Sequence, residues 1–80
     1  MGAAEQFLRE KGFRQLRVRH HDHTARIEIE RSEFDRLFDE GLIAEIVAEF
    51  KRIGYKYVAL DLEGYRTGSM NEVLPLSKNE

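Results

Sequence analysis

The sequence predicts a small α+β domain with the element order α-β-β-α-β. Residues 13–20 and 24–30 alternate apolar and polar side chains around a short polar turn, which is typical of an antiparallel hairpin. A third alternating run follows at residues 55–62. Apolar residues at spacings of three and four predict helices over residues 3–11 and 32–53. We therefore expect a three-stranded, mainly antiparallel sheet with two helices on one face, because all apolar strand positions then share one core.

The first helix and the hairpin follow from local patterns. Ala4, Phe7 and Leu8 lie on one helical face, and Gly12 is the expected stop after a basic residue. In the hairpin, the turn falls at residues 21–23, without the Asn-Gly or Asp-Gly signal that would define the register. Any register that pairs Val18 with an apolar neighbour puts four charged residues on one face, namely Arg17, Arg19, Arg26 and Glu28.

The second helix is expected to begin at a Ser32 cap, with acidic residues in its first turn, and Gly41 is expected to bend it. Gly54 ends this helix, and the third strand follows. After that strand the periodicity is lost among glycines and the only proline. We expect a single domain over residues 1–66 and an irregular or flexible tail over residues 67–80.

Composition narrows the class of protein. The chain has 80 residues, 41% of them hydrophobic and 35% charged, as in one small globular domain. It has no cysteine, which excludes a disulfide framework and a thiolate metal site. The formal net charge is -2, so we expect no nucleic-acid partner. No apolar run is long enough for a membrane span, and no leader is seen at the N-terminus, so we expect a cytoplasmic protein without a membrane partner.

Three arginines form the best candidate site. Arg17, Arg19 and Arg26 would project from one sheet face, and guanidinium groups bind phosphate and carboxylate through two parallel hydrogen bonds. The alternative is an ordinary solvated face, on which Glu28 and Glu30 balance the arginines.

Two other segments carry polar groups. His20, His21 and His23 flank the turn, where residues in solvent are favoured over a metal site, because the side chains alternate in direction. The segment after the third strand is a candidate contact surface or site edge, since ligand sites often lie on loops held by a sheet. Its candidate residues are Glu63, Gly64, Tyr65, Arg66, Ser69 and Asn71. No catalytic or nucleotide-binding loop motif is present.

Several short motifs occur in order along the chain: Gly12-Phe13, Arg17-Val18-Arg19-His20, Ala25-Arg26-Ile27-Glu28, Gly54-Tyr55-Lys56-Tyr57-Val58, and the run from Leu60 to Asn71. This set, spanning about Ala4 to Glu72, resembles the C-terminal region of the LarE family. These are ATP-dependent sacrificial sulfur transferases related to PP-loop pyrophosphatases. The resemblance implies that the Arg-x-Arg strand, here Arg17 and Arg19, binds substrate phosphate. It also implies that Gly64, Tyr65 and Arg66 lie near subunit contacts.

The resemblance further implies chemistry that this chain cannot complete. The family adenylates a pyridinium mononucleotide and transfers sulfur to it, often from its own cysteine. ATP and Mg are expected only in an N-terminal PP-loop domain, whose Ser-Gly-Gly-x-Asp-Ser motif is absent here, as is cysteine. We therefore predict no catalysis from this chain alone, and a PP-loop domain or subunit as its partner.

These observations together predict a non-catalytic domain that binds the phosphate of an anionic mononucleotide and assists assembly of a LarE-like sulfur transferase. The alternative is a structural module with no small-molecule ligand. It would form a homo-oligomer through open strand edges and the tail.

Overall fold

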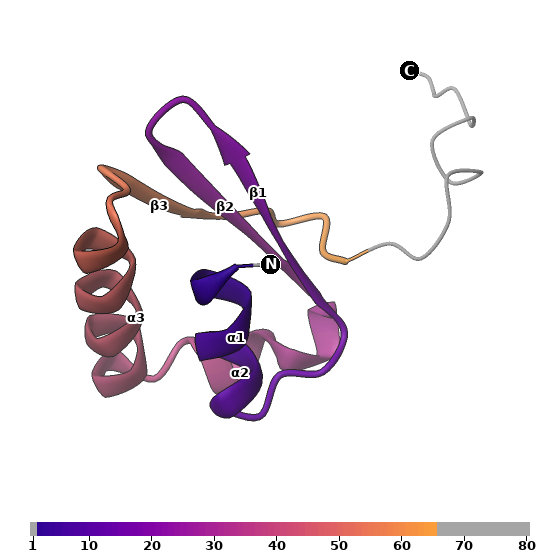
Figure 1. Cartoon of the computed structure of the whole chain (residues 1–80). Coiled ribbons are helices and arrows are strands. Elements are labelled where there is room, and N and C mark those ends of the chain that lie inside the picture. Colours follow the sequence, from indigo (N-terminus) through magenta and orange to yellow (C-terminus); the bar gives the residue numbers. More distant parts are fainter. Residues whose placement is uncertain (1, 66–80) are drawn as a thin grey trace, which may run out of the picture.

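The structure is a computed structural model that describes residues 2–65 of the chain (Figure 1). The expected tail, residues 67–80, lies outside the described residues. The elements in chain order are α1 (Ala3–Glu10), β1 (Leu16–His21), β2 (Thr24–Ile29), the 3₁₀ turn η1 (Arg31–Glu33), α2 (Phe34–Leu37), α3 (Glu40–Ile53) and β3 (Tyr57–Leu60). None of the helices in this part of the chain is long and apolar enough to cross a membrane.

The three strands form one sheet in the order β1-β2-β3. β1 and β2 are antiparallel, with Val18 opposite Ile27, as the hairpin pattern requires. β3 runs parallel to β2 because helix α3 carries the chain back along the sheet before β3 begins. The predicted α+β class and the three strands are confirmed, and the sheet is mixed.

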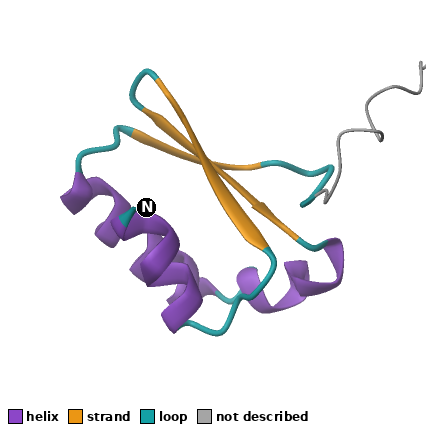
Figure 2. Ribbon diagram, turned by 45° about the vertical axis from the view of Figure 1, so that its right-hand side comes forward, coloured by secondary structure: helices purple, strands orange, loops and turns teal. Residues whose placement is uncertain are grey.

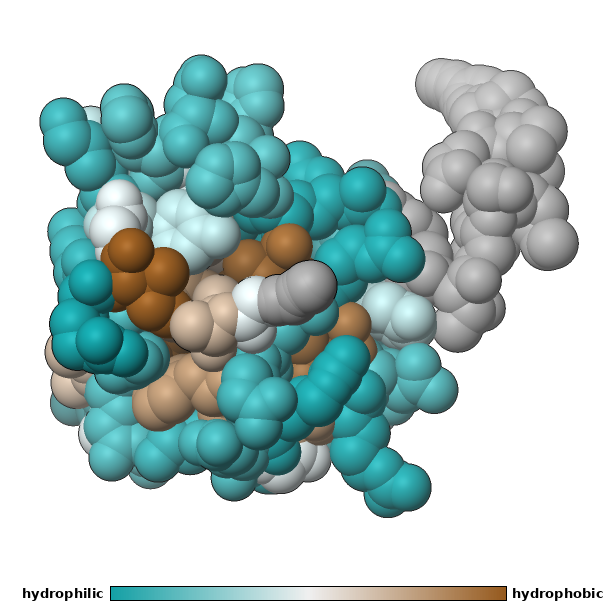
Figure 3. Space-filling model, viewed as in Figure 1, coloured by the Kyte–Doolittle hydropathy of each residue, from teal (hydrophilic) through white to brown (hydrophobic). Residues whose placement is uncertain are grey.

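The helices lie on one face of the sheet, and none of the described helices covers the other face (Figures 1 and 2). Between the two layers is one apolar core, whose largest fully buried side chains are Phe13, Phe50, Leu8 and Ile29. Most of the visible surface is hydrophilic, with separate apolar patches between the polar side chains (Figure 3). The polar strand residues are therefore left on the open side of the sheet, away from the core.

The start of the long helix differs from the prediction. The chain forms η1 and the short α2 first, with no side-chain cap at their starts, so the expected Ser32 cap is wrong. The break falls at Phe38 and Asp39 rather than at Gly41. The Asp39 carboxylate accepts a hydrogen bond of 2.9 Å from the Leu42 amide, which gives α3 a cap of its own.

The other end of α3 matches the prediction. Gly54 ends the helix with a φ of 132°, a conformation that favours glycine. In the last turn Arg52 donates hydrogen bonds to Glu49, and these hold the pKa of the Glu49 carboxyl below its ordinary value.

The new helix start is testable with a matched pair of variants. Asp39→Ala should lower the free energy of unfolding by about 0.5–2 kcal/mol, because the Leu42 amide loses its acceptor. Ser32→Ala should change it by less than about 0.5 kcal/mol. Urea denaturation of both variants measures the difference. A larger loss at Ser32 than at Asp39 would show that the helix begins where the sequence pattern put it.

Candidate anion-binding site

The open face of the sheet carries the charged residues that alternation predicts. Arg17 lies opposite Glu28, and Arg19 lies opposite Arg26, in the antiparallel pairing of β1 with β2. Residues directly opposite one another in such a pair project to the same side of the sheet. The prediction that these four side chains share one face is therefore confirmed.

Glu28 organises this face although it is itself buried. Only 3% of its surface is exposed. One oxygen, Oε2, accepts a hydrogen bond of 3.0 Å from Arg19 Nε and one of 3.4 Å from Arg26 Nη2. A carboxylate away from water requires such charged partners. The alternation of β2 predicts Glu28 on an open face and gives no sign that it is buried.

Asp61 is a second acid in this cluster. Its Oδ2 lies 3.6 Å from Arg26 Nε. Its Oδ1 accepts a hydrogen bond of 2.9 Å from the Glu63 amide, which starts the turn after β3. Arg26 is thus held between Glu28 and Asp61. The acid that balances Arg26 comes from the end of β3, a contact that the sequence pattern did not assign.

The remaining positive charge belongs mainly to Arg17 and Arg19. Three arginines face two carboxylates, so the cluster has one formal positive charge in excess. Arg17 is exposed, and no hydrogen bond or ion pair joins its guanidinium group to any residue from 2 to 65. Arg19 donates to Glu28 through Nε, so the terminal amino groups of Arg19 remain available to solvent. Two such groups on one strand can hold the oxygens of a phosphate.

The loop after β3 is fastened to the same end of the sheet. The Tyr65 amide donates a hydrogen bond of 2.8 Å to the Ile29 carbonyl. Gly64 is buried with a φ of 88°, and a Cβ there would lie 2.9 Å from Arg31 Cγ. Glycine is therefore needed for the close approach. Tyr65 reaches β2 one residue beyond Glu28, whereas Arg66, Ser69 and Asn71 lie outside the described residues.

The three histidines do not converge. His20 Nδ1 is 3.1 Å from the Tyr55 hydroxyl, and His21 Nε2 is 3.7 Å from Asp22 Oδ2. The backbone carbonyl of the third, His23, accepts hydrogen bonds from the Lys56 and Tyr57 amides. Within residues 2–65, no three side chains of the metal-binding types lie together. A shallow hollow near the turn is lined by His20, His21, Thr24 and the two arginines Arg19 and Arg26.

No family model matches the chain. Over 73 residues, or 90% of the chain, it is 41% identical to the pyridinium-3,5-bisthiocarboxylic acid mononucleotide synthase of Lactiplantibacillus plantarum. This chain is similar to a LarE-family enzyme. It is also 40% identical over 74 residues to an uncharacterised protein of Synechocystis sp.. The matches cover 25% and 28% of these two relatives, so the chain spans about a quarter of their length.

The role of Glu28 can be tested through stability. Replacing both partners, Arg19→Met with Arg26→Met, leaves a buried carboxylate unpaired and should cost about 3 kcal/mol or more. Glu28→Gln should cost about 1 kcal/mol, because the half-exposed arginines can then turn to water. Urea denaturation measures both.

A triple variant completes this comparison. Adding Glu28→Gln to the double arginine variant should restore stability, since it removes the unpaired charge. Arg17→Met is the matched control, with an expected change below about 0.5 kcal/mol. A triple variant less stable than the double variant would contradict the assigned role of Glu28.

Proposed function

We propose that this chain is the part of a LarE-like ATP-dependent sulfur transferase that binds the substrate phosphate and assists assembly, without catalysing the reaction itself. One observation carries the proposal. The chain is 41% identical to a mononucleotide synthase over 73 of its 80 residues. An aligned segment of this length includes the positions of Arg17 and Arg19. On the open face, the guanidinium group of Arg17 and the terminal amino groups of Arg19 have no carboxylate partner among residues 2–65.

The expected ligand is a mononucleotide, the class of compound in the name of the Lactiplantibacillus plantarum relative. Its phosphate monoester carries between one and two negative charges near neutral pH. Arg17 and the terminal amino groups of Arg19 supply donors for its oxygens. Arg26 contributes less, because Glu28 and Asp61 already occupy it. Its proposed role is to hold these two acids away from the phosphate.

In this proposal, the chemical steps belong to the part of the relatives that the chain does not match. The chain has no cysteine to supply sulfur and no glycine-rich phosphate loop for ATP. The proposal therefore places ATP, Mg and the sulfur donor in a PP-loop domain or subunit. The present chain would hold the substrate against that partner.

Phosphate binding is tested by NMR titration with nicotinic acid mononucleotide and, separately, with inorganic phosphate. Shifts should cluster at the amides and side-chain Nε groups of Arg17 and Arg19. Arg17→Ala should weaken binding about tenfold, since it removes charge-assisted hydrogen bonds. Arg9→Ala is the matched control, because Arg9 lies on α1, on the other side of the sheet, and its loss should leave binding unchanged. Shifts that cluster elsewhere, or none at all, would refute the site.

Catalytic incompetence has a separate test. The isolated chain should release no pyrophosphate or phosphate from ATP above the buffer rate, with or without Mg and nicotinic acid mononucleotide. The physical reason is that the chain has neither a phosphate loop nor a sulfur donor. Turnover that scales with the concentration of the chain would overturn this part of the proposal.

A further inference from the structure

The outer edge of β3 is open. β3 is the last strand of the sheet, and no described residue pairs with its outer side. The Tyr57 amide donates to the His23 carbonyl just before β2, at 3.1 Å, and the Asp61 amide donates to the Ile27 carbonyl of β2, at 2.9 Å. Because successive amides of a strand point to opposite sides, those of Val58 and Leu60 point outward. An edge of this kind is a template for another strand.

The other edge of the sheet is treated differently. On β1, the Val18 amide donates a hydrogen bond of 3.2 Å to Glu5 Oε2 of α1. A carboxylate placed against an outward amide prevents a second strand from pairing there. Among residues 2–65, one edge of the sheet is thus blocked and the other has no partner.

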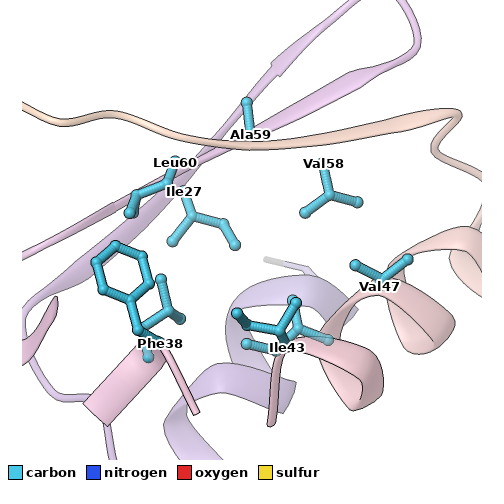
Figure 4. Close-up of a pocket in the computed structure, with 9 residues that line it drawn as sticks. Ile27, Phe38, Ile43, Val47, Val58, Ala59 and Leu60 are labelled. Atoms are coloured by element: carbon cyan, nitrogen blue, oxygen red, sulfur yellow. The ribbon is translucent and has the colours of Figure 1, made fainter. Parts of the chain in front are cut away.

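An apolar hollow lies directly beside the free edge (Figure 4). It has a volume of about 160 Å³ and is lined by residues of α2, α3, β2 and β3, among them Ile43, Val47, Val58 and Leu60. At its rim Phe38 is 53% exposed and Ile43 is 39% exposed. Large apolar side chains left in water beside an open strand indicate an interaction surface. The anion site on the sheet face makes no use of them.

The flank of α3 above this hollow shows which partner fits. Glu40, Ala44, Val47 and Lys51 follow one another at spacings of three and four, and Ile43 lies beside them, so the five form one stripe along the helix. On the opposite flank the charges are already paired, Glu45 with Lys11 and Glu49 with Arg52. Glu40 and Lys51, at the two ends of the stripe, have no ion pair within residues 2–65. The stripe is acidic at one end and basic at the other.

We propose that this surface binds a second copy of the chain about a two-fold axis. β3 pairs antiparallel with β3 of the second copy, and α3 packs antiparallel against its counterpart. Antiparallel packing puts Glu40 of each copy against Lys51 of the other and Ala44 against Val47. The stripe is therefore self-complementary in charge and in size, as a two-fold interface requires.

The strand pairing fits the same axis. With Ala59 on the axis, Val58 lies opposite Leu60 of the second copy. Both residues have outward backbone groups, so they can exchange hydrogen bonds, and both project toward the helix layer. Paired strands lie about 4.8 Å apart and packed helices about 8–10 Å apart. A helix over the gap between β2 and β3 satisfies both spacings at once, and α3 lines a hollow with residues of both strands.

The experiment is a charge-reversal cycle, measured by sedimentation velocity over a range of concentrations at low salt. The chain should be dimeric at high concentration. Glu40→Lys or Lys51→Glu should each weaken dimerisation about tenfold, because two symmetry-related contacts become repulsive. The variant with both reversals should recover to within about twofold of the original chain. Glu10→Lys, on α1, is the matched control and should leave dimerisation unchanged.

Recovery separates the interface from a loss of helix stability. Each reversal opposes the dipole of α3, so a merely structural effect would be largest in the double variant. Amide exchange gives a second readout, since the Val58 and Leu60 amides should exchange more slowly in the dimer than after dilution. A monomer at about 1 mM, a dimer that the double reversal does not recover, or fast exchange at Val58 and Leu60 in the dimer would overturn the proposal. A monomer that instead binds the unmatched part of a relative through this edge would reassign the surface to that contact.

Discussion

Alternation along β1 and β2 confines the apolar side chains of the hairpin to one side of the sheet. With Val18 paired to Ile27, the helix layer receives the apolar residues and the open face receives the charged ones. A shift of one residue in this pairing would reverse both faces at once. The core, the arginine cluster and the separation between them all depend on this one register.

The buried Glu28 decides what the open face can do. Three arginines close together repel one another, and a carboxylate among them lowers that cost. Glu28 accepts a hydrogen bond from only one nitrogen of Arg19, and Arg26 contacts both Glu28 and Asp61. The three arginines therefore differ in how much of each guanidinium group is paired with a carboxylate. Arg26 pairs with two carboxylates, Arg19 pairs with one, and the Arg17 side chain pairs with none within the described part of the chain. The two arginines that remain available are neighbours on one strand, an arrangement suited to a compact anion such as phosphate.

The two proposed surfaces occupy different parts of the molecule. The arginines lie on the open face, over β1 and β2, whereas the free strand edge and the apolar hollow lie beside β3 and α3. In the proposed dimer the sheet continues across the axis with both helix layers on the same side. Both arginine clusters would then lie on one continuous face, so occupation of one surface does not block the other.

Patterns between near neighbours in the sequence are sufficient to predict the local features: the hairpin, the face shared by Arg17, Arg19, Arg26 and Glu28, and the glycine that ends α3. Each depends on spacing between near neighbours or on one residue's backbone freedom. Tertiary structure decided the rest. The direction of β3 depends on where α3 returns the chain, and the structure places the cap of α3 at Asp39 rather than at Ser32. The burial of Glu28 and its link to Asp61 through Arg26 join three strands, and no pattern along one strand reports what lies across the sheet.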